Sequence, residues 1–191
     1  MSTGTGRPLR ADAQRNRDKI LSTATRVFAE QGLDAHLEHI AKEAGVGTAT
    51  LYRNFPTREI LIEAAYRNEL ARLCDAAPGL LAALPPREAL RDWMGRFIDY
   101  ATAKLGMAEA LRAVVESGVN PYAHSREMML EALTSLMDAS VTAGTIRSDI
   151  SATDMFAALT GIALASGKPD QRAQAERLLD LTLDGLSTNR K

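Results

Sequence analysis

The sequence predicts an all-α protein. Apolar residues recur at helical spacing along most of the 191 residues, as they do on the buried face of an amphipathic helix. Nowhere do β-branched and aromatic residues alternate with polar ones for long enough to indicate a strand. Glycines and prolines separate the helical stretches, and these are the residues that favour turns.

The N-terminal part is expected to begin with four helices. The first predicted helix covers residues 13–31. Two short helices over 37–44 and 48–55 follow it, and a tight turn joins them. A fourth helix begins after Pro56, with its apolar residues again at helical spacing, and is expected to end near Ala77.

The stretch from Pro78 to Pro86 contains three prolines and a glycine within nine residues, which predicts a break in the helical pattern. Beyond it, the apolar spacing predicts five more helices, separated by glycine and proline. These helices lie at about 87–104, 107–117, 122–143, 152–166 and 170–187.

Charge is balanced overall but not along the chain. Lys and Arg number 23 and Asp and Glu 24, which gives a net charge of -1 and argues against a protein that coats polyanions everywhere. Residues 1–60 carry nine basic and seven acidic residues, a surplus of +2, and the remaining 14 and 17 leave a deficit of -3. Any nucleic-acid contact is therefore expected from a local face of the N-terminal part.

Cysteine content and hydropathy narrow the class of protein further. The single cysteine, Cys74, cannot form an intramolecular disulfide or a cysteine-rich zinc site. No N-terminal run resembles a signal peptide, and no stretch of 18 uncharged apolar residues could span a membrane. We expect a cytoplasmic protein with no membrane partner and no cofactor.

Patterns of catalytic or metal-binding residues are weak. His36, His39 and Glu43 share a helical face, but a metal site would need a further ligand, so no metal is expected. The sequence also lacks the glycine-rich phosphate loop, the nucleophile elbow and the zinc-protease motif. We therefore expect no enzymatic activity.

Residues 36–61 carry the most specific pattern in the chain. Two helices that cross steeply need a small residue at the crossing, a turn residue that tolerates positive φ, and apolar residues that fill the angle. Ala41, Gly45, and Val46 with Leu51 meet these needs at the expected spacing. The pattern predicts a helix-turn-helix.

This stretch resembles the DNA-binding segment of TetR-family transcriptional regulators. The matching residues are Ile40, Ala41, Ala44, Gly45, Val46, Thr50, Leu51, Tyr52, Phe55, Thr57, Glu59 and Leu61. The C-terminal segments GIALASG and RLLDLTLDGL resemble the dimerisation end of the SbtR-like subgroup. The resemblance implies a three-helix helix-turn-helix DNA-binding domain over 1–61 and a helical effector-binding and dimerisation domain over 62–191.

The resemblance also implies which side chains meet DNA. They are His36, Thr48, Ala49, Thr50, Tyr52, Arg53 and Arg58. Arg53 could donate two hydrogen bonds to a guanine, although an exposed arginine could instead touch only phosphate. The hydroxyls of Thr50 and Tyr52 are expected to bind phosphate oxygens, unless Tyr52 is a core aromatic.

Three positions depart from the family pattern. His36 stands where the family has Ser or Thr as the cap of the second helix, and Glu38 stands where a basic residue is common. Gly47 replaces a serine, which leaves Thr48 as the expected cap of the third helix. We expect phosphate contacts from the second helix to be weaker as a result.

Aromatic and methionine residues predict an effector pocket on the helices that surround the ligand in the resembling family. The candidates are Trp93, Met94, Phe97, Tyr100, Met107, Leu111, Met129, Met137 and Phe156. Each could equally be plain core, because a stripe of this kind also builds helical cores. No cluster of charged residues points inward, so we expect an uncharged or weakly polar organic ligand.

The last two predicted helices carry more apolar residues than one small domain needs, and we expect them to form a two-fold dimer. The interface candidates are Leu159, Ile162, Leu178, Leu179 and Leu186, and Leu181 and Phe156 contribute to the same apolar surface. The sequence thus predicts a dimeric repressor that binds a palindromic double-stranded DNA operator and is released by a small, mostly apolar molecule. The alternative is a non-enzymatic α-helical scaffold that binds another protein.

Overall fold

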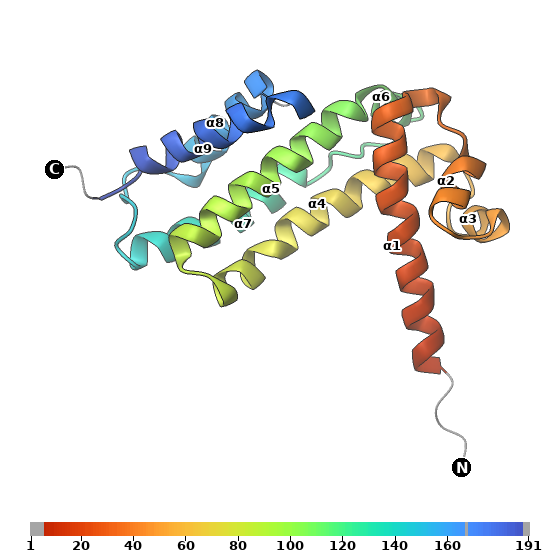
Figure 1. The fold of residues 1–191 in the computed structure, drawn as a ribbon, viewed down its shortest axis with the longest axis horizontal. Helices are drawn as coiled ribbons and strands as arrows, with labels where there is room; N and C mark the ends of the chain where they lie inside the picture. Colours follow the sequence, from red (N-terminus) through yellow and green to blue (C-terminus); the bar gives the residue numbers. More distant parts are fainter. Residues whose placement is uncertain (1–5, 167, 189–191) are drawn as a thin grey trace, which may run out of the picture. The chain divides into compact units, whose positions relative to one another are not determined.

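The computed structural model describes residues 6–166 and 168–188 (Figure 1). These residues form nine α-helices and two short 3-10 helices, and their one extended pairing is an isolated antiparallel bridge between Ile146 and Ser187. The all-α prediction is confirmed. Within the described ranges, no helix combines the length and the apolar character needed to cross a membrane.

The helix bounds follow the apolar periodicity of the sequence closely. In chain order the elements are α1 (Gly6–Gln31), η1 (Gly32–Asp34), α2 (Leu37–Glu43), α3 (Thr48–Asn54), α4 (Arg58–Ala83), α5 (Pro86–Gly106), α6 (Ala108–Glu116), α7 (Ser125–Thr142), α8 (Ala152–Ser166), η2 (Pro169–Gln171) and α9 (Arg172–Gly185).

The helices gather into two compact units. The first unit contains the described residues up to Asn68 together with Gly106–Pro121, and thus α1 to α3, the start of α4, and α6. The second contains Glu69–Leu105 and the described residues from Tyr122 onward, and thus the rest of α4, α5 and α7 to α9. The functional division expected after residue 61 stays a prediction.

Helix α1 supplies the main apolar face of the first unit. Ile20, Ala24, Val27 and Phe28 recur at helical spacing and have no solvent exposure. The helix begins at Gly6, whereas the apolar residues alone predict a start at residue 13. An ion pair between Arg15 and Asp12 joins this added segment to the predicted helix. Such i, i+3 pairs support a helix beyond its buried face.

Helix α4 corrects the expectation of a break at Pro78. It continues to Ala83 with the proline inside it, although an interior proline costs roughly 3 kcal/mol in an isolated helix. Ala77 and Leu80 on either side of the proline are buried, so packing offsets that cost. The chain leaves the helix at the next pair of prolines, and α5 begins at Pro86, where the missing N–H is not needed.

In the second unit, Trp93 of α5 is fully buried, and its indole N–H donates to the carbonyl oxygen of Leu73 at 2.9 Å. Helix α8 packs against both α7 and α9. Two arginines on α5 also pair with acidic residues on α9, since Arg87 lies 2.8 Å from Asp184 and Arg91 binds two neighbouring carboxylates. Apolar packing and ion pairs therefore both connect the helices of this unit.

Candidate functional site

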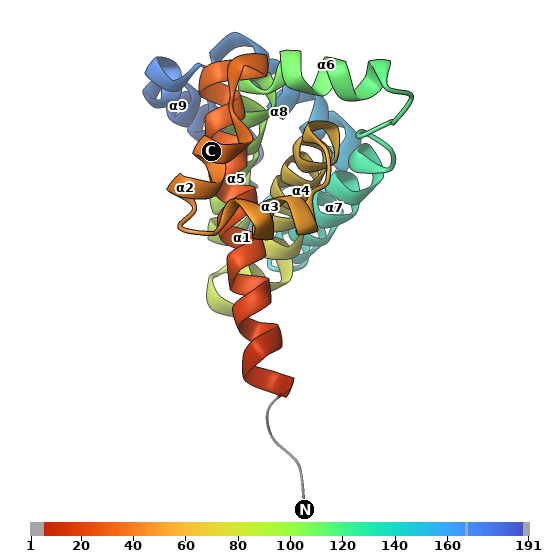
Figure 2. The same cartoon turned by 90° about the vertical axis from the view of Figure 1, so that its right-hand side faces the viewer.

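Helices α2 and α3 lie side by side and meet at a turn that contains Gly45 (Figures 1 and 2). Gly45 has φ +69°, in the left-handed region that glycine adopts at little cost. The N–H of Val46 closes the turn by donating to the carbonyl oxygen of Ala41 at 3.0 Å. Ala41 is fully buried, so a small side chain stands where the helices meet. This is the arrangement of a helix-turn-helix.

Helix α3 presents one apolar face inward and a polar face outward. Leu51 and, just after the helix, Phe55 are buried. Thr48, Ala49, Tyr52 and Arg53 are exposed, and Thr50 is half-buried. Tyr52 has 39% of its surface exposed, so its ring is not part of the core. The candidate DNA-contacting side chains of α3 thus share the surface that α3 leaves open.

The two arginines of this surface are held by carbonyl oxygens. Arg53 folds back along its own helix, where Nε donates to the carbonyl oxygen of Ala49 at 3.2 Å and a terminal nitrogen donates to Thr50 Oγ1 at 3.1 Å. Arg58, at the start of α4, donates to the carbonyl oxygen of Leu33 at 2.6 Å. An Arg53 side chain that reached outward from α3 would have to give up these local contacts.

The hydroxyl of Tyr52 donates to a carboxylate oxygen of Glu38 at 2.8 Å, which links α3 to α2. A hydrogen bond from the backbone at Glu38, with that from Tyr52, lowers the pKa of the Glu38 carboxyl. The same carboxylate raises the pKa of the Tyr52 hydroxyl. The Tyr52 hydroxyl, which was expected to bind phosphate, is therefore already hydrogen-bonded to a negatively charged carboxylate.

The helix caps differ from expectation at one position. Gly47 in an extended conformation is the cap of α3, and Thr48 is the first helical residue, so the expectation that Thr48 caps the helix is wrong. The carbonyl oxygen of Gly47 already accepts the N–H of Thr50 at 2.8 Å, which places the helix start one residue earlier. His36 occupies the cap of α2 without a side-chain hydrogen bond.

On the face of α2 that carries His39 and Glu43, the Glu43 carboxylate is in contact with nitrogen atoms of neighbouring side chains. Arg26 of α1 binds both Glu30 and Glu43, and His39 Nε2 lies 3.5 Å from a carboxylate oxygen of Glu43. Among the residues that the structure describes, no group of three His, Cys, Asp or Glu side chains could hold a metal ion.

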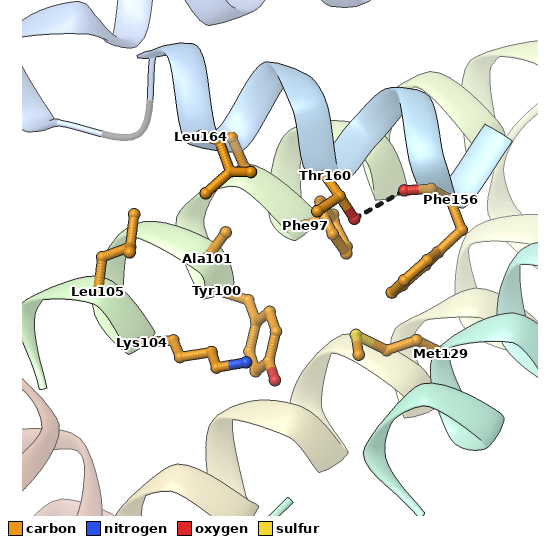
Figure 3. Close-up of a pocket in the computed structure, with 10 residues that line it drawn as sticks. Phe97, Tyr100, Ala101, Lys104, Leu105, Met129, Phe156, Thr160 and Leu164 are labelled. Carbon is orange, nitrogen blue, oxygen red and sulfur yellow. Dashed lines mark hydrogen bonds between the residues drawn. The ribbon is translucent and has the colours of Figure 1, made fainter. Parts of the chain in front are cut away.

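The second unit contains a cavity of about 270 Å³ between α5, α7 and α8 (Figure 3). Its walls are mostly apolar. The lining residues are Phe97, Tyr100, Ala101, Lys104, Leu105, Met129, Phe156, Thr160, Ala163 and Leu164. The rings of Phe97 and Phe156 meet edge to face, with their centroids 5.7 Å apart. A small apolar molecule fits the character of these walls.

Four of the nine pocket candidates line this cavity, namely Phe97, Tyr100, Met129 and Phe156. The others lie elsewhere. Trp93, Met94 and Met137 are buried in the core of the second unit, and Met107 and Leu111 are buried residues of the first unit.

Several lining residues were not among the predicted pocket residues, most of which are aromatic residues or methionines. The most consequential is Lys104. A helical face was nevertheless visible in the sequence, since Phe97, Tyr100, Ala101, Lys104 and Leu105 follow the i, i+3, i+4, i+7, i+8 spacing. That spacing places the lysine beside the predicted aromatic residues.

The interface candidates on α8 and α9 separate into two groups. Leu159, Leu179 and Leu186 are buried within the subunit, and Ile162 and Leu178 are half-buried. Two leucines are far more exposed, Leu164, which was not an interface candidate, at 74% and Leu181 at 69%. Small residues surround Leu164 on α8, where Ala157, Ala158, Gly161 and Ala165 are also exposed. The exposed apolar surface of these helices thus centres on Leu164 and Leu181 rather than on Leu159 and Leu179.

Two family models match the chain. The model for bacterial regulatory proteins of the tetR family matches residues 20–65, which include the helix-turn-helix. The model for the C-terminal domain of SbtR-like transcriptional regulators matches residues 85–188.

Individual proteins match over very different lengths. The crystal structure of a TetR transcriptional regulator from Streptomyces coelicolor is 74% identical, covers 91% of this chain and 99% of that chain, and superposes with a TM-score of 0.88. A TetR regulatory protein from Mycobacterium vanbaalenii is 35% identical, with 95% and 100% covered and a TM-score of 0.78. An HTH-type transcriptional regulator from Staphylococcus aureus strain USA300 is 41% identical over 54 residues, which span 28% of this chain and only 29% of that regulator.

Proposed function

Since the chain belongs to the TetR family of transcriptional regulators, we propose that it is a cytoplasmic, non-enzymatic, dimeric repressor that a small, mostly apolar effector releases from its operator. The single observation that carries the DNA-binding part is the outward face of α3. Leu51 and Phe55 anchor this helix in the core and leave Thr50, Tyr52 and Arg53 on the surface side.

The recognition helix would enter the major groove with this face. Arg53 would read a guanine through a bidentate contact, worth roughly 1–3 kcal/mol of discrimination. Thr48 and Ala49, at the start of the helix, would lie next to the bases. Thr50, Tyr52 and Arg58 would bind phosphates and fix the register without reading sequence. His36, at the cap of α2, would approach the backbone from the neighbouring helix.

A dimer would allow two recognition helices to read a palindrome. Half-sites one helical turn apart place their centres about 34–36 Å from each other. The exposed face of α8 and α9 supports an isologous interface, because Leu164 and Leu181 would lose their water contact there. We therefore place the interface on these exposed leucines, with Ile162 and Leu178 at its base.

Effector release requires that the ligand bind the DNA-free conformation more tightly than the DNA-bound one. The cavity between α5, α7 and α8 is the proposed site for that ligand. Helix α4 is continuous and contributes residues to both units, so it is the element through which a shift around the cavity would reach the helix-turn-helix.

The test is fluorescence anisotropy with palindromic DNA from the region upstream of the coding sequence. The purified protein should bind a labelled fragment as a dimer, and the double variant Thr50→Ala, Tyr52→Phe should weaken that binding on every fragment tested. A protein that binds no fragment, yet captures a protein ligand, would instead be the helical scaffold.

A further inference from the structure

The cavity of the second unit carries one charge in otherwise mostly apolar walls. Among its described lining residues, Lys104 is the one whose side chain is charged at neutral pH, and no aspartate or glutamate lines the space. Figure 3 shows the Lys104 side chain on the same side of the cavity as Tyr100, below the rings of Phe97 and Phe156. A ligand in this cavity therefore lies within reach of an ammonium group.

The position of Lys104 is fixed by its helix and by an aromatic neighbour. It follows Phe97 by seven residues on α5, which places both on one helical face. Its Nζ lies 4.8 Å from the centre of the Tyr122 ring, and the side chain is half-buried. Within the described residues it forms no ion pair. An aromatic face attracts a cation but does not neutralise it.

A second cation lies beside the part of the wall that α8 supplies. The guanidinium of Arg126, on α7, lies 5.6 Å from the centre of the Phe156 ring, and this ring lines the cavity. Arg126 is exposed and, like Lys104, has no ion-pair partner among the described residues. Two cations without ion-pair partners among the described residues thus flank the cavity, and their charge favours an anionic ligand.

We propose that the cavity binds a compact amphiphilic carboxylate, whose apolar body lies against Phe97, Met129 and Phe156 and whose carboxylate pairs with Lys104. This proposal rests on the proposed function, because it names the chemical class of the effector. A lone ammonium is a point charge with three donors, and it matches one carboxylate better than a doubly charged phosphate. A volume of about 270 Å³ falls just below the usual range for drug-sized ligands and favours a small molecule.

The test compares 4-phenylbutyrate with 4-phenylbutanol, which share an apolar body and differ in the charged end. Calorimetry should give about tenfold tighter binding of the carboxylate by the wild-type protein, the gain expected of a hydrogen bond to a charged group. Lys104→Met should remove this preference and leave the affinity for the alcohol unchanged, because methionine retains an apolar stem. Lys104→Arg should restore the preference.

Matched variants separate this effect from general changes in charge or fold. Lys42→Met removes a lysine from α2, in the first unit, and should leave both affinities unchanged. Ala101→Phe fills the cavity and should weaken both ligands together. Circular dichroism and thermal melting of each variant would identify any that fails to fold, and the Lys104→Met and Lys104→Arg pair is decisive without the cavity-filling variant.

Three results would overturn the proposal, and each refutes a different part of it. Equal wild-type binding of carboxylate and alcohol would refute the charged class but keep the cavity as an effector site. A preference that survives Lys104→Met would refute the role of the lysine. Binding of neither compound would refute both the ligand class and the use of this cavity, while operator binding would remain a separate question.

Discussion

Tyr52 donates a hydrogen bond to Glu38 across the helix-turn-helix, over an O···O distance of 2.8 Å. The two residues are 14 positions apart and stand on α3 and α2. The bond holds the tyrosine hydroxyl against an acidic group on the surface proposed to meet DNA. Phosphate would have to compete with Glu38 for this hydroxyl and would also be repelled by its charge.

Replacing Glu38 should therefore strengthen DNA binding. Glu38→Gln removes the charge and weakens the hold on the Tyr52 hydroxyl, so we expect about threefold tighter binding at low salt and a smaller gain at high salt. Anisotropy titrations at two salt concentrations measure both effects. Glu116→Gln removes the same charge from an exposed position on α6 in the same unit and serves as the control. Unchanged or weaker binding by Glu38→Gln would contradict the prediction.

Gly106 should be indispensable for the packing of the first unit. A Cβ at this position would lie 2.7 Å from the Cβ of Ala29, closer than two carbon atoms can approach. Gly106→Ala should lower the free energy of unfolding by roughly 1–3 kcal/mol, as overpacking does. Gly79→Ala is the control, because apart from its chain neighbours and the adjoining backbone of its own helix no atom lies within 4 Å of its added Cβ. That helical substitution should stabilise the protein by about 0.5–1 kcal/mol. Urea unfolding of both variants gives the comparison, and a neutral Gly106→Ala would show that α1 can move away.

Two leucine substitutions should separate the dimer interface from the core. Leu181 is mostly exposed, so Leu181→Glu should remain helical and sediment as a monomer. Leu159 has no exposure, so Leu159→Glu places a charge in the core and should unfold the protein. Val115→Glu changes an exposed valine on α6 and should remain a dimer. A Leu181→Glu protein that sediments as a dimer would move the interface elsewhere.

Cys74 should react slowly in the folded protein. Burial, with smaller contributions from the charges of Asp75 and Glu131, raises the pKa of its thiol to about 11. The protonated thiol is therefore favoured, and at pH 8 its alkylation should be about a hundredfold slower than that of an unperturbed thiol with pKa 9.0. The rate should climb with pH toward 11. Iodoacetamide labelling with and without urea measures the difference, and equal rates in the two conditions would refute the shift.

Much of the fold follows from periodicity, because helical spacing shows which residues of one helix share a face. Leu51 and Phe55 point inward for this reason, and the outward positions on α3 follow directly. The helix through Pro78 could not be predicted, since local preferences disfavour proline there and only packing in the folded unit offsets them.

The candidate site was less predictable because it depends on contacts between distant segments. Nothing in the sequence pairs Glu38 with Tyr52, which the crossing of α2 and α3 brings together. Apolar spacing also cannot tell whether a leucine faces its own subunit or a second copy, and so Leu159 and Leu181 were both predicted to contribute to the interface, although one is buried and the other exposed. Lys104 went unrecognised because a search for apolar residues passes over a lysine whose stem lines an apolar wall.

The most direct test of the account is selection of binding sites from a random pool of double-stranded DNA with the full chain. The enriched sequences should be two-fold symmetric, with half-site centres about one helical turn, 34–36 Å, apart. Arg53→Ala should still enrich symmetric sites but lose the preference at one base pair in each half-site. Enrichment of no sequence, or the same preference at every base pair with Arg53→Ala, would contradict the assignment of α3 as the recognition helix.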